Sequence, residues 1–132
     1  MTKKILIVED EKDFHDIYTG IFKGKDYDIV LAYDGEEALE KLTQIKPDLI
    51  VTDIQMSIVT GDTFFLYLKS MPEYLDIPVI IISSCSQKDY RNFKEIDPDT
   101  TYIEKSHLTG EKLLDEVNKM LAAQIKSPTK MP

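Results

Sequence analysis

Five short apolar runs, separated by helical patterns, constrain the fold of this chain more than any other feature. The runs are residues 5–8, 29–31, 49–51, 79–82 and, more weakly, 101–103. They are rich in β-branched residues and mostly continuous rather than alternating, which is typical of strands buried on both faces of a parallel sheet. A chain of 132 residues is long enough for one domain with a substantial core.

Amphipathic segments with helical spacing lie between these runs. In four of them apolar residues recur about every three to four positions, so that each set predicts one buried face of a helix. The four sets are Phe14, Ile17, Tyr18, Ile21 and Phe22; Ala38, Leu39, Leu42 and Ile45; Phe64, Tyr67, Leu68 and Met71; and Leu113, Val117, Met120 and Leu121. Asp34 with Glu37 indicates an N-cap and its capping-box partner, Thr109 indicates a second N-cap, and Pro72 ends the third helix.

The remaining segment, residues 87–96, is polar and is closed by Pro98, and we interpret it as a short helix. Strand and helix therefore alternate five times. This order predicts an α/β fold, a three-layer (βα)5 sandwich with a flavodoxin-like doubly wound parallel sheet of strand order 2-1-3-4-5. We expect residues 1–123 to form the domain and residues 124–132 to be a disordered tail or the start of a linker.

Composition excludes several classes of function. The net charge of −8, without a cluster of Lys and Arg, argues against direct binding of nucleic acid. No apolar run approaches the roughly 20 residues of a membrane span, and the N-terminus does not resemble a secretory signal. Cys85 is the only cysteine, so no internal disulfide can form and a cytoplasmic location is expected.

The strands are followed by residues whose chemistry predicts one polar site. Ligands of open parallel sheets bind beyond the carboxyl ends of the strands, where Glu9, Asp10 and Asp53 would converge if the first and third strands are neighbours. Three close carboxylates repel one another, and a hard cation such as Mg²⁺ relieves this repulsion. Lys105 adds a positive charge and Ser83 a hydroxyl. Together these groups would hold a phosphoryl group, with the Asp53 carboxylate as its covalent acceptor.

Several motifs, in their order and spacing, resemble the receiver domain of two-component response regulators. They are "ILIVEDE", "GEEALEKL", "PDLIVTDIQM", Gly61, "PVIIISS" and "YIEK", and the resemblance extends from about Lys3 to Leu121. It implies a signalling phosphoacceptor, one that assists its own phosphorylation and dephosphorylation, rather than an enzyme acting on other substrates. Asp53 would receive the phosphoryl group from a histidine kinase or a histidine phosphotransfer protein.

The same resemblance assigns the other residues. Asp10 and Asp53 would bind Mg²⁺ directly, together with the backbone carbonyl of Gln55, and Glu9 would act through a water molecule. Ser83 and Lys105 would contact the phosphoryl group. Tyr102 would turn inward when Ser83 moves, and this change would switch a protein-interaction surface. A downstream protein or a missing output domain would read the switch, and a phosphorylation-dependent homodimer is a possible assembly.

The sequence departs from the family pattern at four places. Glu9 stands where Asp is usual, Ser57 replaces a common proline, and "EIDPDTT" stands where a small-residue stretch is usual before the fifth strand. Ser106 replaces the proline that normally follows the lysine. A cis bond before a residue other than proline costs roughly 2.5–4 kcal/mol, so we predict a trans bond between Lys105 and Ser106.

Most of these residues also have a plainer interpretation. Taken singly, the acids after the first strand would be a solvated cluster at a helix N-terminus, Lys105 a surface lysine and Tyr102 a packing residue. His15 and His107 lack ligand spacing, so we do not expect them to bind metal. Two other classes stay open as alternatives: a flavodoxin-like flavin carrier, which needs a phosphate loop where "EDEKD" stands, and a haloacid-dehalogenase-type phosphatase, which usually needs a second Asp where Gln55 stands.

Overall fold

A computed structural model describes residues 2–54, 61–84 and 93–126 of the chain. Five parallel strands form one sheet of order β2-β1-β3-β4-β5, as predicted. The strands are β1 (Lys3–Val8), β2 (Tyr27–Ala32), β3 (Leu49–Thr52), β4 (Val79–Ser83) and β5 (Thr101–Glu104). The helices are α1 (Lys12–Phe22), α2 (Gly35–Leu42), α3 (Gly61–Ser70) and α5 (Gly110–Lys126), with a 3₁₀ turn η1 (Lys105–His107) after β5.

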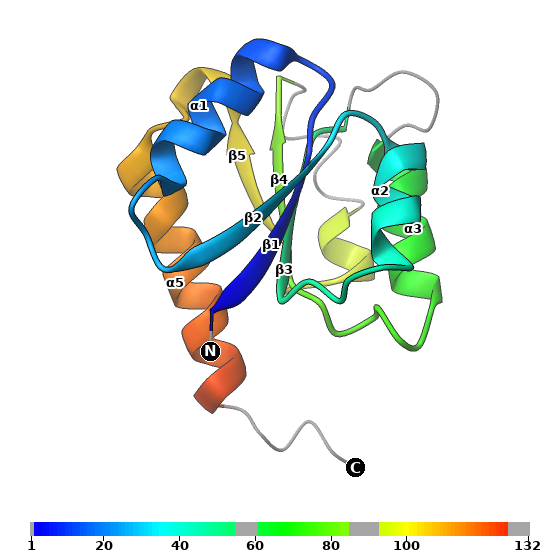
Figure 1. Cartoon of the computed structure of the whole chain (residues 1–132). Coiled ribbons are helices and arrows are strands. Elements are labelled where there is room, and N and C mark those ends of the chain that lie inside the picture. Colours follow the sequence, from blue (N-terminus) through cyan, green and yellow to red (C-terminus); the bar gives the residue numbers. More distant parts are fainter. Residues whose placement is uncertain (1, 55–60, 85–92, 127–132) are drawn as a thin grey trace.

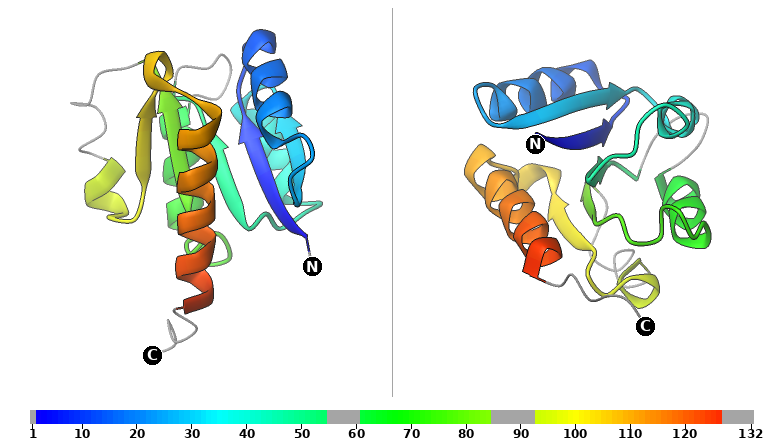
Figure 2. Two further views of the ribbon diagram at one scale, coloured as in Figure 1. Left: turned by 90° about the vertical axis from the view of Figure 1, so that its left-hand side faces the viewer. Right: turned by 60° about the horizontal axis from the view of Figure 1, so that its bottom comes forward.

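The helices cover both faces of the sheet (Figures 1 and 2). Helices α1 and α5 lie on one face, and α2 and α3 lie on the other. Successive side chains of β1 point to opposite faces of the sheet. Leu6 and Val8 therefore belong to the core cluster under α2 and α3, whereas Ile5 and Ile7 belong to the one under α1 and α5. This two-sided burial is the reason that the strands read as continuous apolar runs.

The predicted helix ends agree with the structure in most cases. The Asp34 carboxylate accepts a 2.7 Å hydrogen bond from the Glu37 N–H, and the Thr109 hydroxyl accepts one of 3.1 Å from the Lys112 N–H. The Glu37 carboxylate accepts from the N–H of Tyr33, one residue before the N-cap, rather than from that of Asp34 itself. Helix α3 ends at Ser70, two residues before Pro72.

Two details of the helix prediction need comment. Ile17, predicted to face the core, is 45% exposed, because the buried ridge of α1 consists of His15, Tyr18 and Phe22 instead. Of the predicted helix at residues 87–96, residues 93–96 are helical, and the others lie outside the described residues. None of the helices in the described part of the chain is long and apolar enough to cross a membrane.

Candidate functional site at the carboxyl ends of the strands

The acidic residues predicted from the sequence are placed by the backbone ladder of the central strands. The Glu9 N–H donates to the carbonyl of Ala32 at 3.0 Å, directly after β1, and the Asp53 N–H donates to the carbonyl of Val8 at 3.0 Å, directly after β3. Since β1 lies between β2 and β3, both residues are held at the same edge of the sheet.

Glu9, Asp10 and Asp53 converge, as the strand order predicted. One carboxylate oxygen of each residue lies within 4.8 Å of those of the other two. Glu9 is fully buried and Asp53 is 3% exposed, whereas Asp10 is more exposed than either. Opposite oxygens around one Mg²⁺ lie about 4.2 Å apart, so small side-chain adjustments would bring the three carboxylates around one ion.

Lys105 extends from the end of β5 into the same cluster. Its ammonium lies 2.9 Å from Asp53 Oδ2, 3.2 Å from each carboxylate oxygen of Glu9 and 3.5 Å from Glu11 Oε1. The nitrogen also lies 4.3 Å from the centre of the Phe14 ring. The described residues contain no cis peptide bond, so the bond to Ser106 is trans, as predicted, and the lysine still reaches Asp53.

Burial and mutual charge perturb the ionisation of the cluster. Burial is the main cause that raises the pKa of Glu9 to about 7, and the negative charge of Asp53 is the second. The hydrogen bond from the Glu11 N–H and the charge of Lys105 oppose this rise. Burial alone would lower the pKa of Lys105, but its hydrogen bond with Asp53 and the nearby carboxylates raise it. Burial and the negative charges of Glu9 and Asp53 also raise the pKa of Tyr18, which keeps its phenol protonated.

The remaining predicted residues lie beside this cluster or outside the described chain. Ser83 is fully buried at the end of β4, and the half-buried Tyr102 of β5 donates a 3.4 Å hydrogen bond from its hydroxyl to the Ser83 carbonyl. Gln55, Ser57 and Cys85 lie outside the described residues. The structure thus brings four of the seven predicted site residues into one cluster, namely Glu9, Asp10, Asp53 and Lys105, and places Ser83 and Tyr102 on β4 and β5; the roles of all of them stay predictions.

One neighbour of the cluster was not predicted. His15 is 3% exposed, its Nε2 forms a hydrogen bond with the carbonyl of Glu9, and its ring stacks on Tyr33. The signal in the sequence was the spacing of His15, Tyr18 and Phe22 at i, i+3 and i+7, which is that of a buried ridge.

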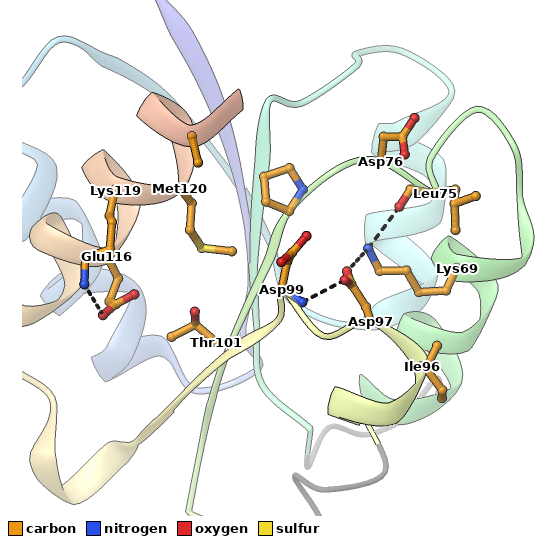
Figure 3. A pocket seen from close by; sticks show the side chains of 12 residues that line it. Lys69, Leu75, Asp76, Ile96, Asp97, Asp99, Thr101, Glu116, Lys119 and Met120 are labelled. Atoms are coloured by element: carbon orange, nitrogen blue, oxygen red, sulfur yellow. Dashed lines mark hydrogen bonds and ion pairs between the residues drawn. The ribbon is translucent and has the colours of Figure 1, made fainter. Parts of the chain in front are cut away.

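A pocket of about 520 Å³ lies at the other end of the strands, near the amino-terminal ends of β4 and β5 (Figure 3). Its lining includes residues just before β4 and at the start of β5, and none of the three clustered acids. Its two lysines are already paired: Lys69 with Asp97 at 2.7 Å, and Lys119 with Glu116 at 3.8 Å. The acidic site at the carboxyl edge therefore remains the stronger candidate for chemistry.

Comparison with known proteins identifies the class to which this fold and site belong. The family described as "Response regulator receiver domain" matches residues 5–118. The polar-differentiation response regulator DivK of Brucella ovis is 33% identical over 88 residues, which cover 67% of this chain and 72% of DivK. The chain belongs to the family of response regulator receiver domains.

Longer relatives and solved structures of receiver domains are also similar to this chain. The hybrid signal transduction histidine kinase D of Dictyostelium discoideum is 30% identical over 92% of this chain, which spans only 8% of that protein. The receiver domain of a histidine kinase from Syntrophus aciditrophicus superposes with a TM-score of 0.83 at 26% identity, covering 99% of this chain and 96% of that one. A CheY-like receiver from Methanospirillum hungatei shares the fold, with a TM-score of 0.85 at 22% identity over 96% of this chain and 99% of the other. Membership of this family excludes the two alternatives that the sequence left open, a flavodoxin-like flavin carrier and a haloacid-dehalogenase-type phosphatase, because both belong to other families.

Proposed function

We propose that this domain accepts a phosphoryl group on Asp53 in a Mg²⁺-dependent reaction and thereby switches a protein-interaction surface. The observation that carries the proposal is the placement of Asp53. Its carboxylate is 3% exposed, lies 2.9 Å from the Lys105 ammonium and shares its edge of the sheet with Glu9 and Asp10.

The residues present fit a magnesium ion. Carboxylate oxygens are the hard ligands that Mg²⁺ prefers, and the buried Glu9 Oε1 accepts no hydrogen bond among the described residues, although the Lys105 ammonium lies 3.2 Å from it. Asp10 and Asp53 would hold the ion directly, with the carbonyl of Gln55, and Glu9 would do so through water. When bound, the ion would neutralise negative charge that develops on the phosphoryl oxygens.

The residues of the chain itself would position the reactants. A carboxylate oxygen of Asp53 would form a bond to phosphorus while the bond from phosphorus to the donor histidine nitrogen breaks, and that nitrogen would keep the electron pair. Lys105 would stay beside the new acyl phosphate as a counter-charge. The Ile54 N–H, which donates a 2.6 Å hydrogen bond to Asp53 Oδ1, would help to orient the carboxylate.

The switch would follow from the contacts of Ser83. A phosphoryl group biases a conformational equilibrium only if it contacts the two states differently. The Ser83 hydroxyl is the contact available at the end of β4, and Tyr102 already bonds the Ser83 carbonyl. A movement of Ser83 toward the phosphoryl group would break this bond and change the surface that includes β5.

Partners follow from the proposed chemistry and the relatives. Relatives of this chain include a sensor histidine kinase of Ectopseudomonas mendocina, of which the chain spans 8%, and the hybrid kinase described above. We infer that a histidine kinase or a phosphotransfer protein donates the phosphoryl group and that the reaction takes place in the cytoplasm. An output protein or output domain would be the target of the signal. Helix α5 extends to Lys126, three residues beyond the predicted domain boundary at residue 123, so only the residues after Lys126 would act as a tail or linker.

A single mass measurement tests the phosphoacceptor. The protein is incubated with acetyl phosphate and Mg²⁺, and its intact mass is recorded with and without an excess of chelator. We expect the mass of one added phosphoryl group in the wild type, none with chelator and none in Asp53→Asn. A phosphoryl group on the Asp53→Asn variant would refute the assignment, and Asp48→Asn, a change at the exposed hydrogen bond to the Lys4 N–H, is the matched control.

A further inference from the structure

His15 contacts the acid cluster from α1, and its geometry differs from that of a residue that only fills space. Its Nε2 bonds the backbone carbonyl of Glu9, and its ring lies 4.1 Å from the Tyr33 ring at an angle of 10°. A carbonyl oxygen only accepts hydrogen bonds, so Nε2 must carry a proton. The other nitrogen, Nδ1, is buried and has no hydrogen-bond partner among the described residues.

The unsatisfied Nδ1 makes histidine a costly residue for packing alone, because a buried polar atom without a partner destabilises the fold. Stacking on Tyr33 would be served equally well by phenylalanine. What histidine adds is the N–H donor at Nε2, which is aimed at a backbone oxygen in the middle of the acid pair.

The position of that oxygen matters for Asp10. The peptide unit that joins Glu9 to Asp10 is planar, so fixing the Glu9 carbonyl also fixes the Asp10 amide and the Asp10 Cα. The Glu9 N–H is held by Ala32 and its Oε2 accepts from the Glu11 N–H at 3.1 Å. Lys105 also contacts the Glu9 carboxylate, so the His15 bond is the fourth contact that holds Glu9, and it is the one made at the carbonyl of the peptide unit that leads to Asp10.

We propose that His15, held by its stack on Tyr33, is a positioning residue that orients the Glu9–Asp10 peptide so that the two carboxylates and Asp53 meet at one cation. The proposal rests on the magnesium site proposed above. It predicts that His15 contributes to the affinity for Mg²⁺ through its donor and not through its bulk.

The test uses variants that separate the donor from the ring. His15→Phe keeps an aromatic ring against Tyr33 and removes the donor. In His15→Gln the side-chain amide nitrogen takes the place of Nε2, whereas in His15→Asn the shorter amide does not reach the carbonyl. Phe22→Leu, a change at a buried residue of the same helix that packs on Tyr27, controls for general loosening of α1.

Mg²⁺ affinity of each variant is measured by calorimetric titration with MgCl₂. Removing a partner in the outer shell of a metal site lowers affinity roughly 10- to 100-fold, and we expect a loss in this range for His15→Phe and His15→Asn. His15→Gln and Phe22→Leu should bind Mg²⁺ as the wild type does. If His15→Phe does not fold, the difference between His15→Gln and His15→Asn decides the matter.

A kinetic readout separates positioning from a structural role. In phosphorylation by acetyl phosphate, His15→Phe should need more Mg²⁺ for half-maximal rate but reach a rate close to that of the wild type at saturating Mg²⁺. Equal Mg²⁺ affinity in the wild type and His15→Phe, or equal losses in His15→Gln and His15→Asn, would overturn the role of His15. Failure of the wild-type protein to bind Mg²⁺ would instead overturn the proposed magnesium site, and the inference with it.

Discussion

The ion pair between Lys69 and Asp97 lies far from the acid cluster and offers a clean test of the energetics of this fold. Lys69 is 4% exposed in its side chain, and its ammonium lies 2.7 Å from Asp97 Oδ2. The same nitrogen donates to the carbonyls of Leu75 at 3.2 Å and Ile77 at 3.0 Å. The pair therefore joins the end of α3 to the segment before β5 and fixes the loop that leads into β4 (Figure 3).

The loss on changing Asp97 to Asn can be bounded from these contacts. A hydrogen bond to a charged group contributes about 1.5–3 kcal/mol, and breaking a buried pair by removing one partner costs about 3–5 kcal/mol. The Asp97 side chain is 18% exposed, and Lys69 keeps its two carbonyl acceptors, so the lower part of this span applies. We expect Asp97→Asn to lower the free energy of unfolding by about 2–3 kcal/mol at neutral pH, or roughly 7–10 °C in Tm.

The pH dependence of this loss has a defined sign. Burial acts to raise the pKa of Asp97, but the hydrogen bond and charge of Lys69 outweigh it and lower the pKa below the ordinary value of 3.8. A carboxylate with a lowered pKa in the folded state stabilises the protein above its unfolded pKa and loses this effect as the pH falls through the folded pKa. The difference between the wild type and Asp97→Asn should thus be constant above about pH 5 and shrink below about pH 4.

Urea unfolding followed by far-ultraviolet circular dichroism measures these values in a double-mutant cycle. The cycle comprises the wild type, Lys69→Met, Asp97→Asn and the double variant, and we expect a coupling energy of at least about 1.5 kcal/mol. Asp99→Asn, at the neighbouring carboxylate, is the control and should change stability by less than about 0.5 kcal/mol. A coupling energy near zero, or an Asp97→Asn loss as large at pH 3 as at neutral pH, would refute the reasoning.

Two further predictions test the caps and the core. Asp34→Ala removes the acceptor for the Glu37 N–H and should lower the free energy of unfolding by about 1 kcal/mol in urea titrations; an unchanged midpoint would contradict the N-cap assignment. Leu68→Ala, at a fully buried position of α3, should cost about 2–5 kcal/mol, whereas Leu66→Ala, at a side chain that is 52% exposed, should cost less than about 0.5 kcal/mol. Equal losses in the two leucine variants would contradict the orientation of α3.

The strand order and the meeting of the acids could be predicted because both follow from local patterns and from rules for parallel sheets. Continuous β-branched runs mark strands buried on both sides, and right-handed crossovers limit how they connect. Once β1 and β3 are neighbours, the residues after Val8 and Thr52 must share one edge. The trans bond after Lys105 was predictable for a similar reason, since its cost is intrinsic to the peptide unit.

The contacts of His15 and Lys69 could not be predicted, because their partners include backbone carbonyls that lie outside the helices carrying these two residues. A sequence shows which side chains are polar but not which carbonyl oxygens a folded loop will present to them. Lys69 resembles an ordinary lysine in the last turn of a helix, and only the fold places the carbonyls of Leu75 and Ile77 around it. Ile17 was assigned to the core for a related reason, since apolar spacing along α1 allows two adjacent ridges and the buried one contains a histidine.

The residue at position 9 provides the last prediction, because Glu stands where the family usually has Asp. Glu9 is fully buried, and its carboxylate accepts from the Glu11 N–H at 3.1 Å and from Lys105 at 3.2 Å. Glu9→Asp would keep the bond to the Glu11 N–H, a contact that Asp makes readily two residues along the chain, but it would draw the carboxylate away from Lys105.

The surroundings of Glu9 fit the longer side chain, so the residue that is usual in the family should be the less stable one here. Loss of one buried methylene costs about 1 kcal/mol, and the weakened contact with Lys105 adds to it, which corresponds to a fall in Tm of roughly 3–4 °C or more. Thermal and urea unfolding of Glu9→Asp in metal-free buffer measure the change, and Glu111→Asp, at an exposed position in the first turn of α5, is the matched control. A Glu9→Asp variant as stable as the wild type would show that the site does not distinguish the two side-chain lengths, and that Glu9 is not held by the contacts described here.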